Sequence, residues 1–477
     1  MGFSTNAFLF FFLPAAIIIF LFSNRLSKGK TDRAIIVLLD ILFYSWGGWE
    51  TLLLFILWIV IAYLIGHYLY YYQICENSNN KGKTGLILSV LVFVGFLVLV
   101  KYAGFLFQQI NSVFHTNWSA LSIMAPLGVS FLVFETVSYL ADIYLKKASA
   151  GSLIDVAIFL SFFPKIISGP IVLWRDFQNQ FIENKVITRT EITNGLDRIV
   201  VGLAKKVILA DSFGALIQKI ENNYNTLGAD RITLWLQAFL YFFQIYYDFS
   251  GYSDIAIGIS YVFGIYLPEN FSFPYTSISI SEFWRRWHIS LGRWFREYVY
   301  IPMGGNRKGN VYLNLFVVFL LTGIWHGAGW KFIMWGVLHG VCVVIERRLR
   351  DTSWYQAVPT IIKWFFTMSV VGLGWILFSS AGFAAFLTLL RDMIRPTVQT
   401  LNYTWRYYLT KKTMILLVIA AFGSVLRIFI PKRKLFDSLT VHRIIFYVKP
   451  LLMLGLFALT IIFVVNSSYS PFLYFQF

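Results

Sequence analysis

Long uncharged stretches constrain this sequence more than any other feature. No Lys, Arg, Asp or Glu occurs in Thr51–Cys75, Trp364–Leu390 or Pro450–Phe477. About 20 apolar residues are enough to cross the hydrocarbon core of a bilayer as a helix. Because lipid offers no hydrogen-bond partner to the backbone, such stretches must be helical unless protein surrounds them. The alternating pattern of membrane β-strands is missing. The sequence therefore predicts an all-α polytopic membrane protein.

The charged residues are few and unevenly placed. Of the 477 residues, 13% are charged, about half the share found in soluble domains. The net charge of +17 comes from short basic segments between the apolar stretches, namely Arg25–Arg33, Lys81–Lys83, Arg285–Lys308, Arg347–Arg350 and Arg427–Lys434. Such segments are typical of cytoplasmic loops facing anionic lipid. We therefore expect membrane lipid as a partner and no nucleic acid.

The same bias orients the chain and excludes two other features. It places Met1 outside and Arg25 inside, and no basic residue precedes Arg25, so the start is not a secretory signal peptide. The two cysteines, Cys75 and Cys342, indicate neither a disulfide framework nor a metal site. We expect no metal ion.

Spanning helices are predicted near 7–24, 34–49, 51–73, 84–110, 196–215, 232–248, 250–266, 311–324, 330–346, 361–380, 413–430 and 450–468. Segments 124–146 and 153–172 are apolar but interrupted, the second by Pro164, Gly169 and Pro170. Proline breaks the helical hydrogen-bond ladder, so a re-entrant element is expected there. Neither a tandem repeat nor a domain linker is visible, which favours one membrane domain over residues 1–477.

The segment 281–310 is both aromatic and basic. At helical spacing, one face would carry Phe283, Trp287, Leu291, Trp294 and Tyr298, and the arginines at 285, 286, 293 and 296 would lie around the others. A basic amphipathic helix with tryptophans is typical of a membrane surface. It predicts a helix on the cytosolic side, either a plain anchor or a docking site for an anionic substrate.

Two histidines are candidates for chemistry. His326 lies in the uncharged stretch Val311–Trp330 with glycines on both sides. An ionisable side chain at membrane depth is costly and is a candidate functional group. His288 lies among the arginines of the amphipathic segment, which disfavour its protonated form and leave a neutral imidazole that can accept a proton. A structural role stays open for both, and His339 is expected to pack on helix glycines.

Asp248 and Asp254 are acidic groups in an apolar neighbourhood. Intramembrane carboxylates can relay protons or bind ions. The alternatives are pairing with an arginine or capping a helix after Gly251, and the sequence leaves these open.

Several motifs together resemble the membrane-bound O-acyltransferase family, in particular its alginate O-acetyltransferase branch. They are Phe283-Trp-Arg-Arg-Trp-His288, Tyr300-Ile-Pro-Met-Gly-Gly-Asn-Arg307 and Gly323-Ile-Trp-His-Gly327, supported by Pro126–Phe131, Ser138–Asp142, Phe163–Ile171, Gly202–Val207, Asp248–Asp254 and Phe472–Phe477. Two positions depart from the pattern: Glu135 stands where the family has Gln, and Ser379 follows Phe378 where an arginine is expected.

The resemblance implies a ring of about 11–13 helices, with re-entrant and amphipathic segments, around a funnel through the membrane. The core of the family would cover approximately residues 120–345. A cytosolic acyl donor would enter the funnel, and the acyl group would leave on the outer side of a bacterial cytoplasmic membrane.

The resemblance also assigns residues. His326 corresponds to the catalytic histidine of the family and His288 to its second, cytosol-side histidine. The same motifs place Trp287, Trp325, Arg296 and Asn306 among the substrate-binding residues. A buried neutral His326 would accept the hydroxyl proton during attack on a thioester, while His288 or backbone N–H groups would stabilise the oxyanion.

Tyr474 is a candidate acyl carrier, because related systems suggest that the tyrosine of a C-terminal Phe-x-Tyr-Phe segment receives the acyl group before an extracytoplasmic SGNH or esterase-like partner does. The other interpretation is an aromatic belt at the membrane interface.

Three functions remain as expectations. The first is O-acetylation of an extracellular or cell-wall polysaccharide with acetyl-coenzyme A as donor and no bound cofactor. The second is teichoic acid D-alanylation from a carrier-protein thioester. The third, from another class, is a flippase or secondary transporter, although the inverted repeats typical of transporters are not visible.

Overall fold

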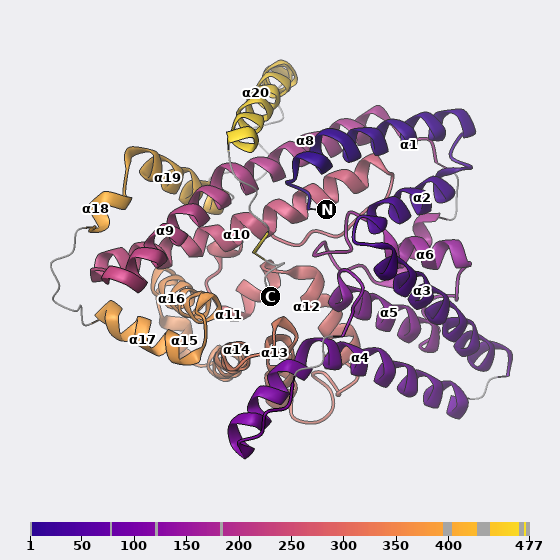
Figure 1. Ribbon diagram of the computed structural model, residues 1–477, viewed down its shortest axis with the longest axis horizontal. Coiled ribbons are helices and arrows are strands. Elements are labelled where there is room, and N and C mark those ends of the chain that lie inside the picture. The colour runs from indigo at the N-terminus through magenta and orange to yellow at the C-terminus, as the bar shows by residue number, and fades with distance from the viewer. Residues whose placement is uncertain are drawn as a thin grey trace. The chain divides into compact units, whose positions relative to one another are not determined.

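A computed structural model describes residues 2–76, 79–119, 123–181, 185–394, 403–426, 439–466 and 472–473. Over these ranges the regular structure is helical, as the coiled ribbons show (Figure 1). The one β-type contact in the described ranges is an isolated bridge between Phe271 and Trp287. The all-α prediction is therefore confirmed. The chain forms two compact units, the first made of Met1–Ile199, Ile255–Glu269 and Arg293–Val299, and the second of Val200–Asp254, Asn270–Gly292 and Tyr300–Phe477.

The first unit contains the N-terminal helices. They are η1 (Phe8–Phe12), α1 (Leu13–Ser27), α2 (Asp32–Ser45), α3 (Trp49–Tyr70), η2 (Tyr71–Cys75), α4 (Asn79–Phe114), α5 (Val129–Tyr144), α6 (Leu153–Ser161), α7 (Trp174–Gln178), η3 (Asn179–Phe181) and most of α8 (Arg189–Ala204). The predicted helix at 34–49 ends four residues too late, because α2 ends at Ser45 and Gly48, at φ 103°, separates it from α3.

The segment 153–172 stops being helical close to its prolines, as predicted. α6 ends at Ser161, and the following backbone is held by buried polar side chains. Asp40 accepts hydrogen bonds from the Ser161 hydroxyl (2.7 Å) and from the backbone N–H of Phe163 (2.8 Å). Lys165 pairs with Glu135 at 2.5 Å, so the glutamate that departs from the family pattern has a buried cationic partner. These contacts satisfy a non-helical backbone away from water. Whether the segment re-enters a membrane stays a prediction.

The second unit contains the remaining helices. They are η4 (Lys205–Ala210), α9 (Asp211–Leu227), α10 (Arg231–Val262), η5 (Pro274–Thr276), α11 (Ile280–Arg286), α12 (Ile289–Phe295), η6 (Arg296–Tyr300), α13 (Val311–His326), α14 (Trp330–Leu349), α15 (Ser353–Ala357), α16 (Thr360–Ser379), α17 (Phe383–Ile394), α18 (Trp405–Tyr408), α19 (Lys411–Val425) and α20 (Leu439–Asn466). α10 and α12 run partly through the first unit, and η6 lies there except for its last residue, Tyr300.

The predicted helices at 232–248 and 250–266 are one helix, α10, so the predicted break at Gly251 is wrong. A Cβ atom at Gly251 would lie 2.8 Å from the carbonyl oxygen of Gly202. Gly251 therefore allows α10 to pack closely against the helix that contains Gly202, and no helix ends at this glycine.

Five described helices are long and apolar enough to cross a membrane: Phe8–Ser27, Trp49–Gln73, Asn80–Phe114, Thr360–Ser379 and Tyr447–Asn466. Val311–His326 is a shorter apolar helix. Large apolar side chains such as Leu451, Leu454 and Val465 of α20 are exposed on the protein. Exposed apolar surface on this scale marks contact with lipid or with a partner.

α13 and α14 form a closely packed pair, and glycines set their separation. A Cβ at Gly323 would lie 2.4 Å from the Phe332 carbonyl oxygen, and one at Gly336 would lie 2.7 Å from that of Phe319. Backbone atoms cannot move aside as a flexible side chain can, so only glycine fits at these points.

We expect Gly336→Ala to lower the free energy of unfolding by about 1–3 kcal/mol, because the added methyl group forces α13 and α14 apart. Thermal unfolding in detergent would measure the change. Gly455→Ala in α20 is the matched control, since no heavy atom lies within 4 Å of its Cβ position. Equal stability of the two variants would contradict the packing argument.

Candidate active site

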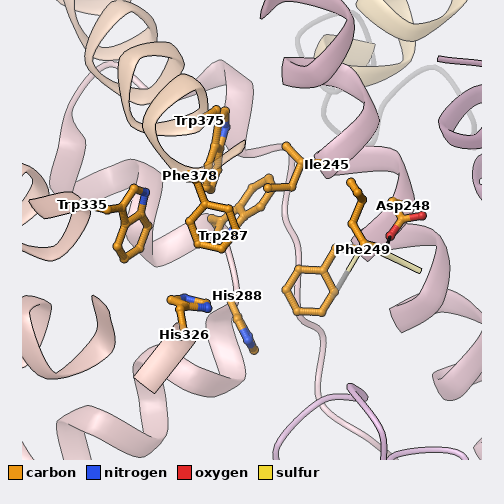
Figure 2. Close-up of a pocket in the computed structure, with 10 residues that line it drawn as sticks. Ile245, Asp248, Phe249, Trp287, His288, His326, Trp335, Trp375 and Phe378 are labelled. Atoms are coloured by element: carbon orange, nitrogen blue, oxygen red, sulfur yellow. Dashed lines mark hydrogen bonds between the residues drawn. The ribbon is translucent and has the colours of Figure 1, made fainter. Parts of the chain in front are cut away.

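Both candidate histidines line the same cavity of the second unit. Ten residues surround it: Ile245, Asp248, Phe249, Trp287, His288, His326, Trp335, Trp375, Phe378 and Leu473. Figure 2 shows the two imidazole rings with the aromatic side chains around them. The volume is about 20 Å³, which is room for one water molecule. The structure thus brings together two residues that lie 38 positions apart in the sequence.

His326 is the last residue of α13, and the α13–α14 turn holds it in place. Gly327 follows with an extended backbone, and a Cβ there would lie 2.3 Å from the ring of Phe332. The glycines beside His326 thus allow a tight turn between two packed helices. Close packing against Phe332 is therefore the reason for glycine at position 327.

Aromatic rings surround His326. Its ring centroid lies 4.9 Å from that of Trp325 and 5.3 Å from those of Trp335 and Phe378, the last two edge to face. The side chain is 9% exposed. Aromatic packing therefore fixes the position of this ring in the wall of the cavity.

The helix predicted through residues 283–298 is broken at His288, so the prediction of one continuous amphipathic helix is wrong. α11 ends at Arg286, Trp287 is extended, and His288 has a φ of 47°. Only a few per cent of residues other than glycine adopt this left-handed conformation. The backbone N–H of Ser272 donates to the Arg286 carbonyl and that of Ile289 donates to the Asn270 carbonyl, each at 3.0 Å. Backbone hydrogen bonds to the segment 270–272 therefore take the place of helical hydrogen bonds at this point.

A side chain of α14 caps the N-terminal end of α11. The carboxylate of Glu346 accepts hydrogen bonds from the backbone N–H groups of Ile280 (2.6 Å) and Ser281 (3.3 Å). The Ser279 hydroxyl accepts from the N–H of Glu282 at 3.1 Å. These bonds satisfy the free donors of the first turn and set the position from which the chain reaches His288.

Asn270 determines which nitrogen of His288 carries a proton. The Asn270 Oδ1 atom accepts from the backbone N–H of Ser290 (3.2 Å) and from its hydroxyl (2.9 Å), and it lies 3.1 Å from His288 Nδ1. A backbone N–H can only donate, so the atom that faces it must be the amide oxygen. His288 Nδ1 must then donate, which leaves Nε2 as the acceptor nitrogen.

This tautomer of His288 is incompatible with one role that the sequence led us to expect for it. A neutral His288 whose Nε2 accepts cannot donate a hydrogen bond from that atom to an oxyanion. Burial lowers the pKa of His288 to about 3, so the imidazole is uncharged at neutral pH. His288 is therefore equipped to accept a hydrogen bond or a proton in the cavity, and the oxyanion role expected from the sequence does not fit this geometry.

Asp248 is the charged residue of the cavity, and it is paired. Its Oδ1 atom lies 2.7 Å from Lys206 Nζ, which also lies 2.7 Å from Asp211 Oδ1. Asp254 pairs with Lys205 at 2.5 Å. The sequence led us to expect an arginine partner or a helix cap after Gly251. Both carboxylates do pair with a basic residue, but the partners observed are lysines in place of the expected arginine.

The other predicted site residues lie in different places. Trp287 lines the cavity, and the ring of Trp325 is buried with its centroid 6.4 Å from that of His288. Asn306 is exposed and accepts a hydrogen bond from Tyr300 at 2.8 Å. Arg296 is exposed and belongs to the first unit. Tyr474 lies outside the described residues.

His339 is buried beside the cavity without lining it. Its Nδ1 atom accepts from Trp284 Nε1 at 3.4 Å, and its Nε2 atom lies 2.6 Å from the Cβ position of Gly374. This agrees with the expectation that His339 packs on a helix glycine. Within the described ranges, no group of three His, Cys, Asp or Glu residues could hold a metal ion.

The sequence interpretation missed Asn270, and it also missed the walls formed by Trp335, Trp375 and Phe378. An asparagine in Pro268-Glu-Asn270 has the features of an ordinary turn residue. Its partner is 18 positions away, and no local pattern signals a pairing at that distance.

The family assignment follows from comparison with known proteins. The sequence model of the membrane-bound O-acyltransferase family (MBOAT) matches residues 41–390. The chain belongs to this family. It is a multi-pass membrane enzyme that transfers acyl groups to hydroxyl oxygens, and the transporter alternative is set aside.

Three MBOAT relatives are similar over most of the chain. The probable alginate O-acetylase AlgI of Pseudomonas putida is 36% identical over 499 residues, covering 100% of both chains. The peptidoglycan O-acetyltransferase of Helicobacter pylori is 33% identical, covering 82% of this chain and 79% of its own. The teichoic acid D-alanyltransferase of Bacillus subtilis is 30% identical, covering 79% of this chain and 98% of its own.

We expect Asn270→Asp to move the acid limb of the activity profile to higher pH. The aspartate still accepts from His288 and Ser290, but its negative charge favours the imidazolium and raises the pKa of His288 from about 3 by about 1–3 units. The neutral form of His288, whose Nε2 atom accepts, is then lost at a higher pH on acidification. The dependence of kcat/KM on pH measures this shift. Asn179→Asp, at an exposed position, is the control, and an unmoved acid limb in Asn270→Asp would contradict the assigned tautomer.

Proposed function

We propose that this protein moves an acetyl group from a cytosolic thioester across the membrane for O-acetylation of an extracellular or cell-wall polysaccharide. The observation that carries the proposal is the enclosed cavity in which His288 and His326 lie together. Two of the relatives are named for O-acetylation, one of alginate and one of peptidoglycan. Their names support acetyl as the acyl group and a polysaccharide as the final acceptor.

The chemistry needs a base for the hydroxyl. The hydroxyl oxygen attacks the thioester carbonyl while His326 takes the hydroxyl proton, and the C–S bond then breaks to release the thiolate. The proton returns from His326 to the sulfur, so the base is regenerated. General-base catalysis of this kind contributes roughly 10²–10⁴-fold. His288 holds its Nε2 lone pair in the same cavity and orients a donor N–H or O–H group of the reactants.

The cavity must widen before it can hold the reactants. Its volume of about 20 Å³ is far below the roughly 300 Å³ or more of a small-molecule pocket. Aromatic rings form most of its wall, and a change of rotamer in one of them would enlarge it. We propose that the thioester end of the donor displaces Trp287 or Trp375, whose ring centroids lie 4.7 Å apart.

Acetyl-coenzyme A is the proposed donor, and the carrier-protein thioester is the alternative. Arg285, Arg293 and Arg296 are exposed and come from the basic segment expected at the cytosolic surface. Positive charge there would attract the phosphates of coenzyme A. The likeness to the Bacillus subtilis D-alanyltransferase keeps the carrier-protein donor as a second candidate.

We expect His326→Ala to lower acetyl transfer by roughly 10²–10⁴-fold, because the hydroxyl loses its base. Membranes supplied with radiolabelled acetyl-coenzyme A, or separately with an aminoacylated carrier protein, would measure transfer and identify the donor. His67→Ala is the control, since His67 lies on α3 in the first unit and is half-buried. Unchanged transfer in His326→Ala would end the catalytic assignment, and labelling by neither donor would end the proposed function.

We also propose that Tyr474 carries the acetyl group on the outer side and hands it to an extracytoplasmic SGNH or esterase-like partner. The phenol oxygen would be the hydroxyl that attacks the thioester. We expect Tyr474→Phe to abolish acetylation of the exported polymer while membrane insertion and donor binding persist. Tyr469→Phe, which removes the same hydroxyl five residues earlier, is the control. Full polymer acetylation in Tyr474→Phe would exclude the relay.

A further inference from the structure

The C-terminal segment Phe472–Leu473 lies at the border of two cavities in the second unit. Leu473 lines the histidine cavity and also a larger cavity of about 1140 Å³. The larger cavity is lined by residues from α9, α10, α19 and α20, including Asp211, Tyr241, Thr413 and Asn466. A single short segment of chain therefore contributes to both walls.

Direct bonds attach this segment to α10. The backbone N–H of Leu473 donates to Asp248 Oδ2 at 2.8 Å, while the other oxygen of Asp248 binds Lys206. The ring of Phe472 is 1% exposed. Its centroid lies 4.4 Å from Lys206 Nζ and 4.9 Å from the ring of Tyr252. Both described residues of the segment thus contact the same lysine–aspartate cluster.

The charges of Lys206, Asp211 and Asp248 explain why the segment Phe472–Leu473 is bound there. Lys206 lies between two carboxylates, Asp211 and Asp248, so the three side chains carry one excess negative charge. The side chains of Lys206 and Asp248 are 1% and 2% exposed. A buried carboxylate needs hydrogen-bond donors in place of water. The N–H of Leu473 supplies one of them to Asp248.

The cluster also spans the border between the cavities. Asp248 lines the histidine cavity and Asp211 lines the larger one, with Lys206 bonded to both. Figure 2 shows Asp248 beside Phe249 at the edge of the histidine cavity. Release of Leu473 from Asp248 would remove a side chain that belongs to both linings.

The positions of the lysines in α16 and α20 favour the outer side of the membrane for the larger cavity, although Lys219 and Lys412 also line it. Ser379 and Asn466, the last residues of α16 and α20, both line it. Both helices contain candidate spans, and both carry their lysines, Lys363 and Lys449, toward the other end. Basic residues mark the cytoplasmic ends of spans, so Ser379 and Asn466 lie at the outer ends.

We propose that Lys206, Asp211 and Asp248 form a docking site for the C-terminal segment, and that the docked segment is a removable wall between the histidine cavity and the outer cavity. Docked, it keeps water on the outer side from the thioester at His326. Released, it opens a path between the two cavities. The function of the wall rests on the proposed acyl transfer, whereas its existence as a docked segment does not.

Thiol labelling tests the docking without any enzyme assay. Leu473→Cys is introduced into a chain in which Cys75→Ser and Cys342→Ser remove the native thiols, and the protein is labelled with a maleimide in detergent. We expect Asp248→Asn to raise the labelling rate at position 473 by about tenfold or more, because a hydrogen bond to a charged group is lost. Phe472→Ala should raise it too, without any change in buried charge.

Asp254→Asn is the matched control. Asp254 lies on the same helix and pairs with the neighbouring lysine, Lys205. Its carboxylate does not line the border between the cavities. The labelling rate in Asp254→Asn should match that of the parent. Equal rates in Asp248→Asn, Phe472→Ala and Asp254→Asn would overturn the docking proposal.

A second measurement tests what the wall does. We expect Asp248→Asn to release more acetate from acetyl-coenzyme A per acetyl group transferred, since water then attacks the thioester carbonyl and leaves acetate and coenzyme A. An unchanged ratio together with faster labelling would overturn the water-excluding role and retain the docked segment. Failure of the parent protein to use any thioester would count against the proposed function alone.

Discussion

The amide oxygen of Asn270 is the acceptor on which the geometry of the active site depends. It receives hydrogen bonds from His288, from the backbone N–H of Ser290 and from the Ser290 hydroxyl. Because these residues are buried, each of these donors would otherwise be unsatisfied at a cost of about 1–3 kcal/mol. Satisfying them breaks the helix at His288, holds that residue at a positive φ and fixes its neutral tautomer. The helix is interrupted at this point, and the interruption orients the imidazole of His288.

Close packing of glycines has the corresponding role for His326. Gly323 and Gly336 let α13 and α14 approach until backbone faces backbone, and Gly327 turns the chain directly after the histidine. The imidazole is then held against Trp335 and Phe378 by ring contacts. Hydrogen bonds to Asn270 position His288, and aromatic ring contacts help to position His326. This difference follows from their surroundings, since His288 adjoins a polar loop and His326 a wall of aromatic rings.

Much of the site could be predicted from residue type alone. His326 stands out because an ionisable group in an uncharged stretch is costly, and His288 because it interrupts a basic aromatic segment. The sequence also indicated that Asp248 would need a partner. It could not identify Lys206 as that partner, because the two residues are 42 positions apart and lie on different helices. It also misjudged residues 283–298 as one helix, because helical spacing was strong and the competing bonds to Asn270 are not local.

The sequence by itself determined that this is an all-α membrane protein and which histidines it offers for chemistry. Apolar length and the scarcity of charge are properties of composition, and lipid permits few backbone solutions. Only the tertiary structure decided that His288 and His326 share a cavity, that His288 presents an acceptor nitrogen, and that Leu473 lines the cavity and donates a hydrogen bond to Asp248. Each of these outcomes is a pairing of residues distant in the chain. Such pairings depend on which buried donors and acceptors meet after the helices have packed, and no pattern of neighbours in the sequence records that.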